Sequence, residues 1–172
     1  MRLGAALLAV ALAAPAGSAS AQPALGSLPP PVTPACISSP FGPRNLPGPH
    51  AAKFHNGIDF PAPAGAWVRA VAPGEVAFIA RRSEYGLVID LLHGDGHGGQ
   101  FVTRYAHLGT VGPKLEGGQR HVAAGDRLGR IGYTGITYGT HLHFELHVAG
   151  KPVDPEPFFA VPRCSAKAGG GE

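Results

Sequence analysis

The stretch Gly139-Thr140-His141-Leu142-His143-Phe144-Glu145-Leu146-His147-Val148 decides the fold. Apolar and polar side chains alternate from His141 to Val148, which is the pattern of a half-buried β-strand. The apolar side chains are expected to face a core, and the polar ones place three imidazoles and a carboxylate in a row. Imidazole and carboxylate are zinc ligands, and a strand holds them in fixed directions. The stretch therefore predicts either a metal site or an ordinary polar strand face.

Similar short segments fill the middle of the chain. Turns rich in glycine and proline separate them, and no long stretch repeats apolar residues at the helical period of about 3.6. Strand character is found at residues 67–72, 75–80, 87–92, 100–106, 127–131 and 141–148. The sequence therefore predicts the all-β fold class, as a compact domain of short antiparallel strands.

The N-terminus has the organisation of a secretory signal peptide. Met1 and Arg2 are followed by an unbroken apolar run at 3–14, and Ala19-Ser20-Ala21 is a small-x-small cleavage site. The run is shorter than the ~20 apolar residues that a bilayer span needs. The sequence predicts a signal peptide at 1–21 and an exported protein, periplasmic or extracellular, without a membrane span in the mature chain.

Two cysteines, Cys36 and Cys164, lie on either side of the segment with strand character. In an exported protein such a pair indicates a disulfide, and two separate thiols are the alternative. We expect a Pro-rich linker at 22–35, one folded domain at 36–164 and a disordered tail at 165–172.

The charges indicate no nucleic-acid partner. The chain has 14 Lys and Arg against 11 Asp and Glu, and they are scattered along the sequence rather than clustered as in nucleic-acid-binding proteins. Such a mildly basic chain would not repel an anionic polymer. The sequence does not indicate an oligomeric state.

Two further segments carry candidate metal ligands. In a fully extended strand the Cα atoms of His55 and Asp59 would lie about 13 Å apart, whereas zinc needs donors within ~2.2 Å of itself. Asn56-Gly57 is a favourable turn pair, so we expect a bend there. His107 follows the segment at 100–106 and is expected to project at the strand's exit. Each segment alone could be an ordinary loop.

Together, His55, Asp59 and His143 form a set of three N and O ligands with one position left for water, as in catalytic zinc sites. His107 and His141 remain as imidazoles able to transfer protons near neutral pH.

The other polar side chains receive simpler interpretations. Glu145 is expected to hold a ligand imidazole in one tautomer. Surface or loop positions are expected for His50, His93, His97, His121 and His147.

The ordered set of motifs resembles the lysostaphin-type, LytM-like zinc endopeptidases of bacterial cell walls. The resemblance covers about residues 37–159. The matching pieces are, in order, Ser38-Ser39-Pro40-Phe41-Gly42-Pro43-Arg44, His55-Asn56-Gly57-Ile58-Asp59-Phe60, Val71-Ala72-Pro73-Gly74-Glu75-Val76, Tyr105-Ala106-His107-Leu108, residues 122–132, Thr134-Gly135, His141-Leu142-His143-Phe144-Glu145 and Lys151-Pro152-Val153-Asp154-Pro155.

The resemblance implies an antiparallel β domain with an open substrate groove. It implies one zinc ion per chain, bound by His55, Asp59 and His143, with His107 and His141 as catalytic histidines that do not bind the metal. The turn at 94–99 is longer and richer in glycine than the family's usual hairpin, which leaves the edge of the groove there undefined.

The function implied is that of an exported zinc metalloendopeptidase that hydrolyses peptide cross-links or stem-peptide bonds of peptidoglycan. One alternative is a non-enzymatic LytM-like activator of cell-wall amidases, for which loss of some of the five site residues would be expected. Another is a biotinyl or lipoyl carrier domain, which needs a lysine at a hairpin tip. The two glycine-rich segments at 68–76 and 122–132 contain no lysine.

Overall fold

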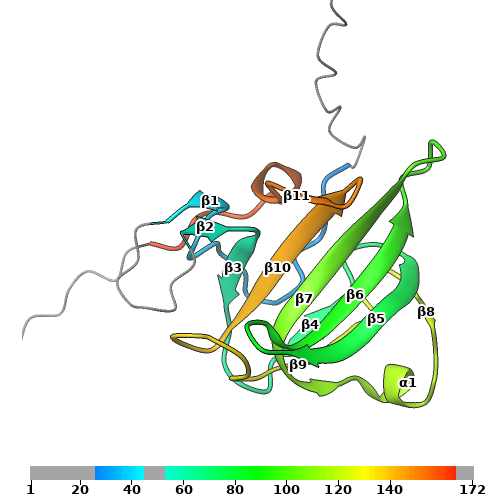
Figure 1. The fold of residues 1–172 in the computed structure, drawn as a ribbon, viewed down its shortest axis with the longest axis horizontal. Coiled ribbons are helices and arrows are strands. Elements are labelled where there is room, and N and C mark those ends of the chain that lie inside the picture. The colour runs from blue at the N-terminus through cyan, green and yellow to red at the C-terminus, as the bar shows by residue number, and fades with distance from the viewer. Residues whose placement is uncertain (1–25, 45–52, 166–172) are drawn as a thin grey trace, which may run out of the picture.

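The computed structural model describes residues 26–44 and 53–165 (Figure 1). The predicted signal peptide and the tail after Ser165 lie outside the described residues. No helix in the described part of the chain has the length and apolar character to cross a bilayer.

The described residues form an almost entirely β structure, as predicted. Besides the strands there is one short helix and one 3₁₀ turn. The elements are β1 (Gly42–Pro43), β2 (Phe54–His55), β3 (Ile58–Pro61), β4 (Trp67–Arg69), β5 (Gly74–Arg82), β6 (Gly86–Gly94), β7 (Gln100–Val111), α1 (Pro113–Glu116), β8 (His121–Val122), β9 (Arg127–Ile131), β10 (His141–Val148), β11 (Lys151–Val153) and η1 (Glu156–Phe158).

One antiparallel sheet holds most of these strands in the order β11-β10-β7-β6-β5-β8. β3 pairs with β10, β9 pairs with β7, and β4 pairs with β9. β1 and β2 form a separate two-stranded sheet, which lies beside β3 in Figure 1. β10 therefore occupies a central position, with β7 along one edge and β3 and β11 along the other.

The alternation along β10 sends its apolar side chains into the core. Leu142, Phe144 and Leu146 are fully buried, and Phe144 packs edge-on against Tyr105 and Phe159. The opposite side chains are not a solvent-facing row, because His143 and Glu145 are also buried. A strand with polar residues buried on its second face needs hydrogen-bond or metal partners for each of them.

β7 changes its pairing partner from β10 to β9 at His107. The strand pairs with β10 up to Ala106 and with β9 from Leu108 onward. Between them His107 has φ of 60°, a left-handed conformation that residues other than glycine seldom adopt. The expectation that His107 lies at the strand's exit is therefore wrong, because β9 offers a new edge along which β7 continues to Val111.

The N-terminal segment is tied to the C-terminal one. The predicted disulfide between Cys36 and Cys164 is present. Within the segment predicted as a linker, Leu28 and Val32 are buried in the hydrophobic core. The Leu28 amide also donates to the Phe158 carbonyl at 2.7 Å. Residues 26–35 therefore pack against the folded domain and are not a free linker.

The glycine-rich turn at 94–99 closes the hairpin of β6 and β7. The Asp95 carboxylate accepts hydrogen bonds from the His97 and Gly99 amides at 2.8 Å. His107 lies seven positions after Gln100 in β7, which is about 23 Å of strand. The hairpin projects from the opposite end of the sheet (Figure 1), so the turn does not border the histidines described below.

Candidate metal centre

The bend predicted at Asn56 and Gly57 brings His55 and Asp59 together. β2 ends at His55 and β3 begins at Ile58. A Cβ atom on Gly57 would lie 2.1 Å from the Phe144 carbonyl oxygen, so only glycine permits this close approach to β10. β3 then pairs with β10 so that Asp59 lies directly opposite His143.

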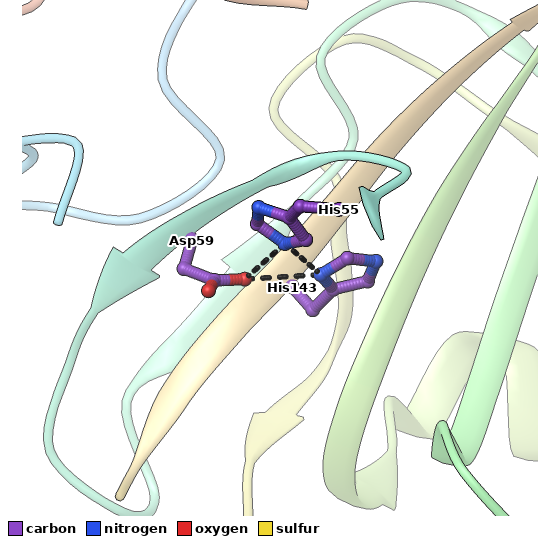
Figure 2. A group of neighbouring side chains, drawn as sticks. All are labelled: His55, Asp59 and His143. Atoms are coloured by element: carbon purple, nitrogen blue, oxygen red, sulfur yellow. Dashed lines mark hydrogen bonds and ion pairs between the residues drawn. The ribbon is translucent and has the colours of Figure 1, made fainter. Parts of the chain in front are cut away.

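Three donor atoms converge at this point (Figure 2). His55 Nε2 is 3.1 Å from Asp59 Oδ1 and 3.0 Å from His143 Nδ1, and His143 Nδ1 is 3.0 Å from Asp59 Oδ1. All three residues are buried. In a tetrahedral zinc site with ligands at 2.0–2.2 Å, neighbouring donor atoms lie about 3.3–3.6 Å apart. The triangle is thus close to the size that zinc binding needs, and three ligands leave one of the four positions without a protein ligand.

Hydrogen bonds on the outer ring nitrogens define which tautomers occupy the site. His55 Nδ1 donates to the Pro40 carbonyl at 2.7 Å, and His143 Nε2 donates to Glu145 Oε1 at 2.9 Å. Both acceptors lack protons, so each ring carries its hydrogen there and presents a lone pair to the other ring and to Asp59. Three lone pairs facing one another require a cation between them, which fits a metal ion.

The electrostatics of the cluster agree with this donor set. Burial alone would raise the pKa of Asp59, but its contacts with His143 and His55 hold that pKa below the ordinary value. The Arg44 guanidinium donates to Asp59 Oδ2 at 2.8 Å and leaves Oδ1 to the histidines. Burial also opposes protonation of His143, yet Asp59 and Glu145 raise its pKa on balance. A proton and a metal ion therefore compete for His143 Nδ1.

His107 and His141 lie beside the triangle. Their rings are 4.9 Å apart, the ring of His107 is 5.9 Å from that of His143, and His141 Nε2 is 3.7 Å from Asp59 Oδ1. Nδ1 of His107 donates to the Thr134 carbonyl at 2.8 Å, and Nδ1 of His141 donates to the Gly139 carbonyl at 2.9 Å.

Both of these rings are uncharged near neutral pH. Burial lowers the pKa of His107 to about 4, and burial likewise lowers the pKa of His141. Because each Nδ1 carries the hydrogen, each Nε2 is left with a free lone pair that can accept a proton. The structure thus brings all five residues singled out in the sequence into one cluster.

Behind His143 lies a buried polar network of which the sequence revealed only Glu145. As expected, Glu145 holds the His143 ring; it also accepts from His147 Nε2 at 2.6 Å and from Arg104 Nη1 at 3.3 Å. Arg104 in turn binds both carboxylate oxygens of Asp90, at 2.9 and 2.8 Å. Burial would raise the pKa of Glu145, but His143 and His147 keep that pKa below its ordinary value.

Two histidines depart from the surface or loop positions expected for them. His147 is half-buried against Glu145, and its place on the same face of the period-two strand was the available signal. His93 is buried, stacked on Phe101 at 4.6 Å, and bonded to the Pro73 carbonyl and Thr103. Its place two residues after Leu91, on the same strand face as Leu91 and Ile89, was the available signal.

An open hollow of about 370 Å³ adjoins the cluster. It is lined by Arg82, Ser83, Glu84, Tyr85 and Arg104. The ring of Tyr85 packs 5.6 Å from that of His143, and the Arg104 guanidinium lies over the Tyr85 ring. Two of the side chains that line the hollow, Tyr85 and Arg104, thus also contact His143 and Glu145.

Comparison with known proteins identifies the family. The family described as Peptidase family M23 matches residues 53–155. Over 119 residues the chain is 40% identical to a DD-carboxypeptidase/endopeptidase, Mpg, of Neisseria meningitidis and 38% identical to the peptidoglycan DD-endopeptidase ShyA of Vibrio cholerae. Each alignment covers 69% of this chain but 26% of the relative, so the chain spans about a quarter of the length of these curated relatives.

Solved structures show the same fold. The catalytic domain of lysostaphin, an antimicrobial peptidase from Staphylococcus simulans, is similar with a TM-score of 0.62 and 28% identity over 72% of this chain and 91% of that domain. A zinc-containing peptidase from Vibrio cholerae also has a TM-score of 0.62, with 30% identity over 77% of this chain and 39% of that protein.

Proposed function

The chain belongs to peptidase family M23, and on that premise we propose that it is an exported zinc endopeptidase acting on peptide cross-links or stem-peptide bonds of peptidoglycan. One observation carries the proposal. The His55, Asp59 and His143 donor atoms lie within 3.1 Å of one another, and two further uncharged imidazoles, His107 and His141, border the same point. A protein that only bound a partner would have no use for this combination.

The three donor residues would hold a single zinc ion. Bound zinc supplies Lewis-acid activation of a scissile carbonyl and of a water molecule. Pro40 and Glu145 keep the His55 and His143 rings in the tautomers that direct lone pairs to the metal. His143 and His55 hold the pKa of Asp59 low, so the carboxylate need not lose a proton before it binds, and Arg44 donates to its second oxygen.

The remaining two histidines would move the protons of peptide hydrolysis. Both present an unprotonated Nε2, so either ring can accept a proton from the attacking water. The imidazolium formed can then stabilise negative charge on the carbonyl oxygen or protonate the leaving amine. Thr134 and Gly139 hold the two rings in place through their carbonyl oxygens. No carboxylate base is needed, because histidine does this work.

Two parts of the proposal have their own support: that peptidoglycan is the substrate, and that the protein acts outside the cytoplasm. Two relatives at 38–40% identity carry the names of peptidoglycan or DD-peptidases. The disulfide between Cys36 and Cys164 suits an oxidising compartment. The N-terminal pattern of a basic start, an apolar run and a small-x-small site points to the export route.

Digestion of isolated peptidoglycan tests the proposal. The purified mature protein is incubated with peptidoglycan sacculi, with and without a chelator, and the soluble fragments are identified by mass. We expect new free amino groups on peptide fragments, uncut glycan strands and no release in the chelator. If the folded, zinc-loaded protein released nothing but accelerated a separate amidase, the protein would be a non-enzymatic activator and the proposed peptidase activity would be wrong.

A further inference from the structure

A second surface outside the metal centre concentrates positive charge. β4 and β9 pair so that Trp67 is opposite Arg130 and Arg69 is opposite Arg127. The guanidinium of Arg130 lies 3.7 Å from the centre of the Trp67 ring and that of Arg127 lies 4.7 Å from it. These four side chains, Trp67, Arg69, Arg127 and Arg130, are called the arginine face below.

The folded chain creates this cluster from charges that are scattered in the sequence. Val68 and Leu128 are fully buried. The register shifts between Val68 and Arg69, so Arg127 and Arg130, three positions apart, both lie on the face opposite these buried side chains, together with Arg69. Arg127 and Arg130 are exposed, and Arg69 is half-buried. Gathering three like charges on one short ribbon raises the local positive potential.

No acidic partner from the described residues neutralises the arginine face. None of its three guanidiniums lies within 4.0 Å of a carboxylate in that part of the chain. Asp126, which precedes Arg127, pairs with Lys114 at 2.9 Å instead. Arg69 and Arg130 each donate to a backbone carbonyl, of Gly125 and Gly65, which leaves further N–H donors on both.

Stacking on the Trp67 indole prepares Arg127 and Arg130 to bind oxyanions. A guanidinium that lies over a ring keeps its N–H edges free, and its rotamers are already restricted before a ligand arrives. Such an edge matches a carboxylate through two parallel hydrogen bonds. The chemistry of the arginine face is therefore recognition of several carboxylates by fixed guanidiniums.

β9 connects the arginine face to the candidate metal centre. Immediately after β9, the Gly132 amide donates to the His107 carbonyl at 3.0 Å, and Thr134 accepts from the His107 ring. Thr134 lies four positions after Arg130, which limits the distance between their Cα atoms to about 14 Å. One polymer can therefore contact both places.

We propose that the arginine face is a second binding site for the wall polymer, which engages free carboxylates of peptidoglycan stem peptides while a neighbouring peptide occupies the metal centre. The choice of this polymer rests on the proposed function. A membrane surface fits less well, because the ribbon presents no exposed apolar side chain that could enter the acyl layer.

Co-sedimentation with sacculi tests the proposal without turnover. Binding is measured in a chelator at low salt for the wild type, for Arg127→Gln/Arg130→Gln, and for Arg81→Gln/Lys151→Gln. The last pair removes the same charge from exposed positions elsewhere. We expect the arginine-face variant to bind roughly 5- to 30-fold more weakly, as for loss of two exposed guanidinium–carboxylate contacts. The control should bind as the wild type does.

Three further measurements decide the interpretation. The difference should shrink in about 1 M salt, and it should vanish on sacculi whose carboxylates have been converted to amides. Thermal unfolding shows that the variant is folded. Equal binding of wild type and variant to untreated sacculi would overturn the proposal, as would a loss seen only with vesicles of phosphatidylglycerol. Because the chelator stops any hydrolysis, these outcomes are independent of whether the protein is a peptidase.

Discussion

Four histidine rings at the candidate centre each donate one N–H to an oxygen acceptor. The acceptors are the Pro40, Thr134 and Gly139 carbonyls and the Glu145 carboxylate. A carbonyl or carboxylate oxygen can only accept, so all four rings are fixed in one tautomer with the second nitrogen bare. Two bare nitrogens meet Asp59, and the other two face the space beside it. The hydrogen bonds thus divide the four histidines into the two that we propose bind the metal and the two that we propose carry protons.

Glu145 is the one acceptor in this set that carries a full charge. Replacing Glu145 with glutamine removes that charge from behind His143 and leaves Arg104 bound to Asp90. We expect zinc affinity to fall by about 10- to 100-fold, the usual effect of losing a carboxylate that supports a ligand histidine. Competition with a chromophoric chelator measures the affinity, and the exposed Glu116→Gln is the control. Unchanged zinc affinity would mean that the charge of Glu145 does not support metal binding by His143.

His107 and His141 differ from the ligands in what their loss should do. Neither donates to the triangle, so His107→Ala and His141→Ala should keep zinc and the fold. Each should lose on the order of 10²- to 10⁴-fold in rate, the size of a general acid–base contribution. The check is a rate on one wall preparation together with the zinc content of each variant. If a variant lost its zinc, the substituted histidine would instead be a metal ligand.

Among the elements, the bend between β2 and β3 makes the site possible. Gly57 passes so close to the Phe144 carbonyl that a side chain would overlap backbone atoms. Gly57→Ala should therefore push β3 away from β10 and separate Asp59 from His143. We expect zinc affinity to fall and the free energy of unfolding to drop by about 1–3 kcal/mol.

Gly94→Ala is the matched control, because a Cβ atom there would contact nothing within 4 Å and its φ is not positive. Chemical denaturation and zinc titration of both variants provide the comparison. If Gly57→Ala equalled Gly94→Ala in both measurements, the close approach would not be what positions the two ligands.

Sequence pattern predicts the longer strands better than the short ones. The predicted segments at 127–131 and 141–148 coincide with β9 and β10. In β10 apolar and polar residues alternate over eight positions, which is enough to show the period. β1, β2 and β8 have two residues each, too few for any period. Their pairing comes from the surrounding chain, which the pattern does not contain.

The same limit applies to the site. The spacing of His55 and Asp59 around a turn pair predicts the bend, and the period-two strand predicts the direction of His143. Arg104 enters the network because the register of β7 and β10 places it opposite Glu145, and that register cannot be read from either strand alone. The arginine face arises in the same way, from the register of β4 and β9.

The molecule as a whole is closed by the disulfide between Cys36 and Cys164, 128 residues apart in sequence. In the chain-entropy model, a crosslink that closes such a loop restricts the unfolded chain and raises the free energy of unfolding by up to about 5 kcal/mol. Cys36→Ala/Cys164→Ala should therefore lower the free energy of unfolding by about 2–5 kcal/mol. Denaturant titration with and without reductant measures it. The wild type should lose stability in the reductant and the variant should not; equal stability of wild type and variant would contradict the role.

The central claim is that His55, Asp59 and His143 form one zinc site, and metal content per chain tests it most directly. The purified, zinc-reconstituted wild type, His143→Ala and the exposed control His121→Ala are desalted, and their zinc is measured by atomic emission. We predict one zinc ion per chain in the wild type and in His121→Ala, and none in His143→Ala. A wild type without zinc, or a His143→Ala protein that retains one equivalent, would contradict the claim.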